Sequence, residues 1–160
     1  MKTNKQQLEN RKALRHYLNR YYRAKERQAN LRRRLSDLRL ELDGLGASPL
    51  SMANIHAKGQ TGSGAAAMVL RICDIEERIK RQADLESRIV LEIMDVIELL
   101  PAGSIEREIV EFRHIDCKNW TEIERLAHLT RSPCFEAYNR GLDSLLEHRK
   151  IRELIGADRH

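Results

Sequence analysis

Aromatic residues, prolines and long apolar runs are all scarce in this sequence. Aromatic side chains make up 4% of the 160 residues, and only three prolines occur. This composition disfavours a thick globular core and favours long helices with solvated faces. No segment approaches the roughly 20 apolar residues that a membrane span needs, and no charged segment followed by an apolar one indicates export. We therefore expect a cytoplasmic protein.

Cysteine is also rare. Cys73, Cys117 and Cys134 are the only three, and they lie far apart with no CxxC spacing. An odd number without paired spacing argues against a disulfide framework. We interpret all three as reduced thiols, which agrees with a cytoplasmic location.

Charged residues, in contrast, are abundant and unevenly distributed. They form 33% of the chain, and the formal net charge is +5. Residues 1–43 contain 13 Lys or Arg against five Asp or Glu, a local net charge of +8. A basic segment of this kind can bind a phosphate backbone, but a solvated helix face explains the charge as well. Within this segment the DNA-binding hypothesis points to Arg32, Arg33 and Arg34.

Two long segments carry apolar residues in alternating steps of three and four, the spacing of a coiled-coil seam. Residues 4–43 contain no Gly or Pro and predict one helix of about 60 Å. Residues 66–100 predict a second helix of roughly 53 Å. The first seam consists of Leu14, Tyr17, Tyr21, Ala24, Gln28, Leu31, Leu35, Leu38, Leu42 and Leu45. The second consists of Ile72, Ile75, Ile79, Gln82, Glu86, Ile89, Ile93, Val96 and Leu100. Its two polar members either set the register or oligomeric state, or mark a point where the seam frays.

Residues 44–65, between these segments, are rich in Gly, Ser and Ala. The cluster of Gly59, Gly62 and Gly64 would suit a phosphate-binding loop, but the spacing and the Lys-Ser/Thr pair of a P-loop are missing. We interpret the segment as a linker. It would let the two helices fold back antiparallel, or let each pair with another chain in a homo-oligomer. Residues 1–100 are thus predicted to form a helical hairpin or coiled-coil arm.

The pattern changes after residues 100–103, which read Leu-Pro-Ala-Gly and mark the predicted domain boundary. Residues 101–160 contain three short amphipathic segments. Ser104 is the expected N-cap of the first, which ends near Ile115. Thr121 and Glu124 predict a capping box for the second, with Trp120 just outside it. The expected inward residues of these two helices are Ile105, Ile109, Val110, Phe112, Ile123, Leu126, Ala127 and Leu129.

The third segment begins with Ser132 and Pro133, which predict an N-cap and the first helical position. Its expected buried stripe consists of Cys134, Ala137, Tyr138, Gly141, Leu142 and Leu145, and its opposite face of Glu136, Asn139, Arg140 and Asp143. A short helix, a tight turn and a longer capped helix form the helix-turn-helix layout. In that motif the second helix enters the major groove with its N-terminal residues on base edges. A three-helix bundle that never contacts DNA would show the same pattern.

Residues 104–150 resemble region 4 of sigma-70 factors. The first helix reads REIVEFRHI, the second NWTEIERLA, and the third opens after LTRS and ends GLDSLL. With the preceding helical arm and Gly-rich linker, the chain looks most like phage-encoded sigma-70 region-4-like regulators of late genes, the RinA/ArpU-like group. The resemblance implies that four residues lie where sigma factors read the −35 promoter element: Arg131, Ser132, Phe135 and Glu136.

No catalytic or metal site is expected. His114 and Cys117 have a spacing that a metal could use, with His128 not far along the chain, but the second ligand pair of a zinc site is missing. Neither a nucleophile elbow nor a Ser/His/Asp order is visible. We therefore expect a protein that is not an enzyme and needs no cofactor.

The sequence thus predicts an all-α protein, a helical hairpin or coiled-coil arm followed by a C-terminal helix-turn-helix. We expect it to bind double-stranded promoter DNA and regulate transcription, with RNA polymerase as a possible partner. Two alternatives stay open. One is a DNA-binding oligomer like a small terminase subunit. The other is a coiled-coil adaptor that does not bind DNA, favoured by a net charge of −1 over residues 101–160.

Overall fold

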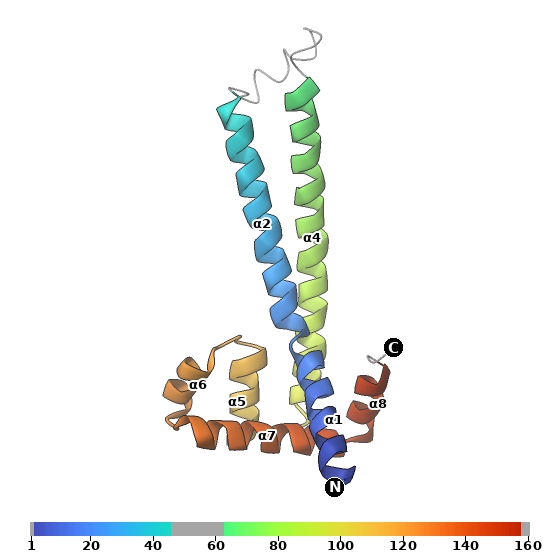
Figure 1. Cartoon of the computed structure of the whole chain (residues 1–160), viewed down its shortest axis with the longest axis vertical. Helices are drawn as coiled ribbons and strands as arrows, with labels where there is room; N and C mark the ends of the chain where they lie inside the picture. Colours follow the sequence, from blue (N-terminus) through green and yellow to red (C-terminus); the bar gives the residue numbers. More distant parts are fainter. Residues whose placement is uncertain (1, 46–62, 158–160) are drawn as a thin grey trace. The chain divides into compact units, whose positions relative to one another are not determined.

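The computed structural model describes residues 2–45 and 63–157 of the chain, and within these residues helices are joined by turns and short irregular segments, with no strand (Figure 1). The prediction of an all-α fold is therefore confirmed. None of the described helices combines the length and apolar character that crossing a membrane requires. In chain order the helices are α1 (Lys2–Leu18), α2 (Arg20–Gly44), α4 (Ser63–Ile97), α5 (Ile105–His114), α6 (Trp120–Ala127), α7 (Arg131–Glu147) and α8 (Arg149–Ala157).

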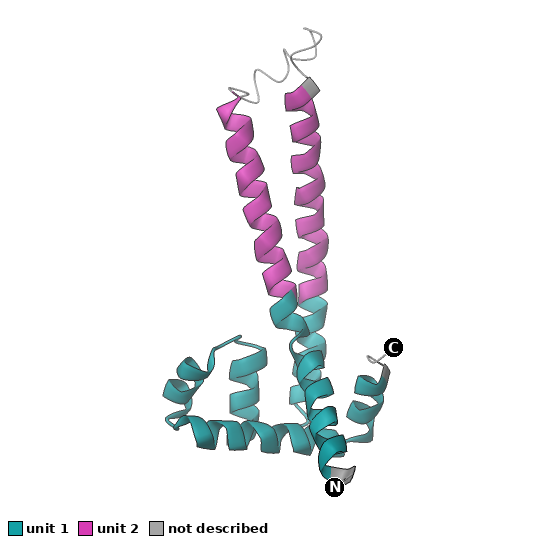
Figure 2. Ribbon diagram, viewed as in Figure 1, with its two compact units in different colours: residues 1–23, 87–160 teal, residues 24–86 magenta. Residues whose placement is uncertain are grey.

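The chain divides into two compact units (Figure 2). Unit 1 comprises residues 1–23 and 87–160, and unit 2 comprises residues 24–86. The units change between residues 23 and 24 and between residues 86 and 87, so the predicted domain boundary at residue 101 coincides with neither point. The reason is that α1 contacts α7 and α8, so both ends of the predicted arm share the core of the C-terminal bundle.

Unit 2 is an antiparallel pair of helical segments from α2 and α4. The Arg39 guanidinium lies 2.7 Å from the Glu76 carboxylate, and the Gln82 side chain donates a 3.2 Å hydrogen bond to the Ala24 carbonyl. The interrupting Gln82 of the second predicted seam therefore has a partner within the same chain. Four of the five buried residues described in this unit belong to the two predicted seams: Ala24, Gln28, Leu35 and Ile72. The fifth, Ala65, lies outside the seams.

The limits of the two long helices differ from the prediction in two further places, besides the end of α4, which lies at Ile97 and not at residue 100. Asn19 separates α1 from α2, although helical hydrogen bonds from Asn19 N to Arg15 O (2.9 Å) and from Arg23 N to Asn19 O (3.1 Å) continue across it. At the other site α4 begins at Ser63, so Gly64 belongs to a helix and not to the predicted linker. Three alanines follow Gly64 and favour the earlier start, because alanine has the highest helix propensity. Gly59 and Gly62 of the predicted linker lie outside the described residues.

Unit 1 buries its core where α1, the end of α4 and the four C-terminal helices meet. Its fully buried large side chains are Leu14, Leu18, Ile93, Ile97, Leu100, Ile109, Val110, His114, Ile123, Leu142, Leu145 and Ile151. Helix α8, which contacts both α1 and α7, was not predicted from the sequence. Ile151 and Ile155 are the buried residues of α8, and their spacing of four fits a helix but is too short a pattern to predict one.

Candidate nucleic-acid interface

Helix α6 begins two residues earlier than the sequence analysis predicted. Asn119 is its N-cap and forms a reciprocal capping box with Glu122, in which each backbone N–H donates a 2.9 Å hydrogen bond to the other side chain. Trp120 is consequently the first residue of the helix and does not lie outside it. The predicted box of Thr121 and Glu124 is wrong because Asn-x-x-Glu satisfies the same hydrogen-bonding requirement two positions earlier.

A three-residue turn joins α6 to α7. His128 ends α6 in the left-handed conformation (φ 53°, ψ 39°), and the extended Thr130 is the N-cap residue of α7. The prediction of Ser132 as N-cap and Pro133 as the first helical residue is therefore wrong by two positions. Pro133 still lies in the first turn of α7. The N–H groups there have no intrahelical acceptor, so the proline costs the helix no hydrogen bond. The arrangement is a helix, a short turn and a longer helix.

One face of α7 is packed into the bundle. All six residues of the predicted stripe are buried: Cys134, Ala137, Tyr138, Gly141, Leu142 and Leu145. Gly141 allows the close crossing with α5, because a Cβ atom there would lie 3.2 Å from Val110 Cγ2. The prediction for α6 is less accurate, since Ile123 is fully buried but Leu126 is 39% exposed. Helix α7 is thus held from behind by α5 and α6.

A buried histidine and tyrosine link α5 to α7, which sequence reasoning missed. His114 Nε2 lies 2.8 Å from the Tyr138 hydroxyl oxygen, and both side chains are buried. Burial lowers the His114 pKa to about 3, with a further contribution from Arg113, and burial raises the Tyr138 pKa. Both groups are therefore uncharged at neutral pH. Cys117 is only half-buried, and the described residues contain no cluster of three metal-binding side chains.

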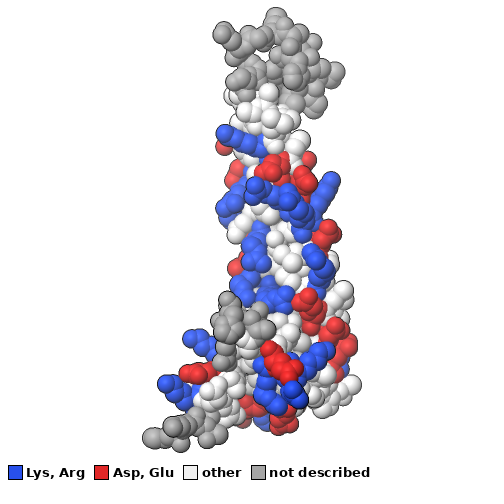
Figure 3. Space-filling view, turned by 90° about the vertical axis from the view of Figure 1, so that its right-hand side faces the viewer, with Lys and Arg blue, Asp and Glu red and all other residues white. Residues whose placement is uncertain are grey.

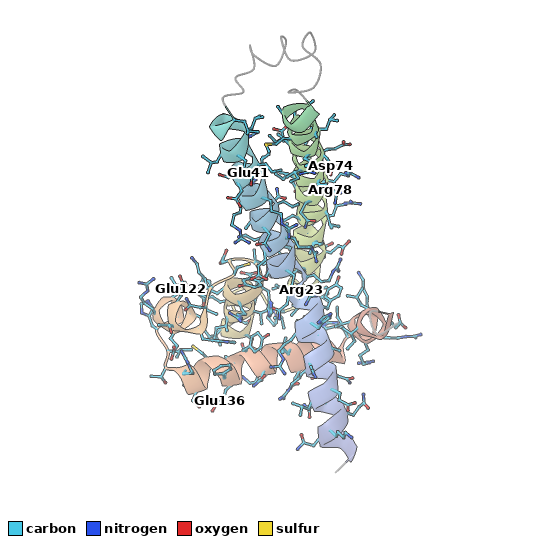
Figure 4. The ribbon with its side chains drawn as sticks, turned by 45° about the horizontal axis from the view of Figure 1, so that its top comes forward. Arg23, Glu41, Asp74, Arg78, Glu122 and Glu136 are labelled. Atoms are coloured by element: carbon cyan, nitrogen blue, oxygen red, sulfur yellow. The ribbon has the colours of Figure 1, made fainter. Side chains whose placement is uncertain are left out.

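The N-terminal half of α7 presents an exposed surface opposite this packed face. Ser132, Phe135 and Glu136 are all exposed there, and Figure 4 labels Glu136 on the side of α7 that faces away from α5. The Phe135 ring lies against Trp120 at a centroid distance of 4.2 Å. The Ser132 hydroxyl lies 3.4 Å from the Glu136 carboxylate, to which it donates. These three predicted site residues therefore share one accessible surface.

The two predicted basic residues of α7 are exposed but already paired. Arg131 donates to the Glu124 carboxylate at 2.9 Å and to the Thr121 hydroxyl at 3.3 Å. Arg140 donates to the Glu106 carboxylate at 2.9 Å, and this hydrogen bond holds the Glu106 pKa below its ordinary value. The positive charge of the predicted interface is thus balanced locally by acidic groups on α6 and α5.

Helix α1 covers the C-terminal half of the predicted exposed face of α7. Asp143 accepts two hydrogen bonds from the guanidinium of Arg11, one of them 2.6 Å from Arg11 Nε. This pairing keeps the pKa of the Asp143 carboxyl below its ordinary value. Asn139, one turn earlier, is half-buried. The expectation that Asp143 lies on an open face is therefore wrong, and the available reading surface ends near Asn139.

Arg32, Arg33 and Arg34 belong to unit 2 and are all exposed. Arg32 lies one turn before the buried seam residue Leu35, on the same side of α2, whereas Arg33 and Arg34 lie further round the helix. Arg33 donates to the Asn30 side chain at 2.9 Å, and none of the three forms an ion pair with another described residue. On the face of the molecule drawn in Figure 3, acidic side chains are interspersed among the basic ones.

No protein-family model matches the chain, and no curated protein or solved structure matches it either.

Proposed function

We propose that this chain is a sequence-specific DNA-binding transcription regulator whose α7 enters the major groove. One observation carries the proposal: the N-terminal half of α7 is exposed while its other face is fully packed, and α6 precedes it after a three-residue turn. In helix-turn-helix proteins this half of the second helix contacts base edges, and the preceding helix crosses the DNA backbone. The resemblance of residues 104–150 to sigma-70 region 4 supports the same assignment.

The paired state of Arg131 is compatible with this function. Its side chain is 55% exposed and Glu124 is 23% exposed, so the pair lies near the surface, where such pairs contribute about 0–1 kcal/mol. A DNA phosphate can therefore replace the carboxylate partner at little cost. Function by binding requires neither a cofactor nor enzymatic activity, and RNA polymerase is the partner that a promoter-bound regulator would reach.

The same ion pairs favour a second candidate, a coiled-coil adaptor that binds another protein and no DNA. Arg131 and Arg140 are both balanced by carboxylates, so the surface of α7 has little net positive charge to attract DNA. The small-terminase-like alternative shares DNA binding with the proposal and differs in the target sequence. A gel-shift assay with DNA from upstream of neighbouring genes separates the adaptor from both DNA-binding functions.

The variants Arg131→Ala and Glu136→Ala test the groove assignment. Glu136→Ala should weaken binding to the specific site by roughly 5- to 150-fold, because one good base contact contributes about 1–3 kcal/mol of discrimination. Arg131→Ala should also weaken binding, through loss of a positive charge at the DNA backbone. Helical circular dichroism should not change, since both side chains are exposed. Arg149→Ala is the matched control, because Arg149 is 86% exposed and lies on α8. Wild-type affinity in both α7 variants would exclude α7 as the reading helix.

A further inference from the structure

The exposed half of α7 offers an unusual set of chemical groups for reading DNA. Its accessible side chains are an aromatic ring (Phe135), a carboxylate (Glu136) and a hydroxyl (Ser132). The arginine at its start, Arg131, is directed to acceptors on α6 and away from these groups. A guanine is most often recognised by a bidentate Arg or Lys. Arg131 and, one turn after Glu136, Arg140 are both paired with carboxylates of neighbouring helices. The remaining groups of this surface are an apolar ring and an acceptor.

Phe135 is positioned as a rigid apolar contact. The ring is 37% exposed and its inner side lies against Trp120, 4.2 Å between centroids. Trp120 is itself fixed by an edge-on contact with the buried Tyr138 at 5.2 Å and by the Arg113 guanidinium at 5.4 Å. An aromatic side chain held in this way loses little conformational entropy on binding. In the major groove the apolar group that it can meet is the C5-methyl of thymine.

Glu136 is positioned as a hydrogen-bond acceptor beside this ring. An ionised carboxylate only accepts hydrogen bonds, and the Ser132 hydroxyl occupies part of one oxygen. The remaining lone pairs face solvent. Among the major-groove groups, the exocyclic amino group of cytosine is the donor that Glu and Asp recognise.

On the basis of the DNA-binding function proposed above, we propose that α7 reads pyrimidines, with a thymine methyl against Phe135 and a cytosine amino group donating to Glu136. Arg131 then contacts a phosphate, because its guanidinium lies at α6, the helix that crosses the backbone in this motif. Phosphate contacts fix the register of the protein on DNA, whereas base contacts determine sequence preference. Removing Phe135 or Glu136 should therefore change the preferred DNA sequence, whereas removing Arg131 should weaken binding to all sequences alike.

The thymine contact can be tested by removing one methyl group from the DNA. The full-length protein first selects its preferred site from a randomised duplex pool. Each thymine of that site is then replaced by deoxyuridine, which differs only by the missing C5-methyl. One replacement should weaken binding by about fourfold, the effect of exposing one buried methyl group. Phe135→Ala should bind the thymine and uracil duplexes equally, and Leu91→Ala, which removes a 61% exposed side chain from α4, should keep the wild-type difference.

The cytosine contact is tested by Glu136→Gln. Glutamine forms bidentate hydrogen bonds with adenine, so a second selection with this variant should replace one cytosine by adenine with a preference of at least about fivefold. Arg131→Gln should instead weaken binding to all duplexes alike and leave the selected sequence unchanged.

Three results would overturn the proposal: no thymine whose replacement weakens wild-type binding, a Phe135→Ala variant that keeps the wild-type difference, or an unchanged cytosine in the Glu136→Gln selection. The deoxyuridine comparison on wild-type protein needs no variant, so the thymine contact can still be tested if Phe135→Ala fails to fold. Failure of the wild-type protein to select any sequence would instead refute the proposed DNA-binding function itself.

Discussion

Removing either charge of the Arg11–Asp143 pair should loosen α1 from α7. The two residues are 132 positions apart in the sequence, and their side chains are 26% and 30% exposed. The contact is bidentate and charge-assisted, the geometry in which Arg–carboxylate pairs are strongest. We expect Arg11→Gln and Asp143→Asn each to lower the free energy of unfolding, because each leaves a half-buried polar partner behind.

The expected magnitude follows from this partial burial. Fully exposed pairs contribute about 0–1 kcal/mol, and hydrogen bonds to charged groups contribute about 1.5–3 kcal/mol. A pair that is about one quarter to one third exposed should lie between these limits, so we expect a coupling free energy of about 1–2 kcal/mol in a double-mutant cycle. The lowered pKa of Asp143 also sets the sign of the pH dependence. Its contribution is complete at neutral pH and disappears as the pH falls through that lowered pKa and the carboxylate is protonated.

The assay is urea unfolding of the wild type, both single variants and the double variant, at pH 7 and at pH 2. Trp120 is the only tryptophan and lies in α6, in the same unit as the pair, so its fluorescence reports on unit 1. The control cycle uses Arg149 and Glu153, whose side chains are 86% and 63% exposed and which should couple by about 0.3–0.5 kcal/mol. Equal coupling in the two cycles at pH 7, or coupling that does not weaken as the pH is lowered, would refute the assigned role of the Arg11–Asp143 contact.

Three further predictions concern other parts of the molecule. The His114 pKa of about 3 lies below the ordinary histidine value of 6.5, so stability should fall as the pH drops from 6.5 towards 3. His114→Gln should remove this dependence near pH 5 in urea titrations, and a slope equal to that of the wild type would contradict it. Leu142→Ala should lower the free energy of unfolding by about 2–5 kcal/mol, measured by circular dichroism, and Trp120→Ala by less, because Trp120 is only half-buried whereas Leu142 is fully buried. A decrease below about 1 kcal/mol for Leu142→Ala would place that residue outside the core. Replacing the arginines of residues 32–34 with Gln should reduce the slope of log affinity against log salt by about 0.9 for each DNA phosphate that the variant no longer neutralises. An unchanged slope, at unchanged oligomeric state by light scattering, would assign these arginines to a solvated face.

The sequence predicted packed faces well because periodicity determines which side of a helix is apolar. The whole buried stripe of α7, from Cys134 to Leu145, followed from its spacing. Helix starts were less predictable. At both Asn119 and Thr130 the true N-cap lies two residues before the predicted one, because several neighbouring residues have side chains or backbones suited to that position.

Contacts between distant helices could not be predicted from one sequence. The stripe that contains Leu14 and Tyr17 continues without change beyond Asn19, so nothing in its spacing shows that α1 packs on α7 while α2 pairs with α4. Asp143 was expected on an open face for the same reason, since its partner Arg11 lies at the other end of the chain. The short α8 was missed because its two buried residues, Ile151 and Ile155, give too brief a pattern.

The packing of α1 on α7 also has a consequence for folding during synthesis. The two helical segments of unit 2 are close in sequence and can pair soon after α4 leaves the ribosome. Helix α1 must wait for α7, because Asp143 is synthesised 132 residues after Arg11. At about 5–20 residues per second this interval is roughly 7–26 s. During that time the apolar face of α1, with Leu14 and Leu18, lacks its final partner and is available to chaperones or to other chains.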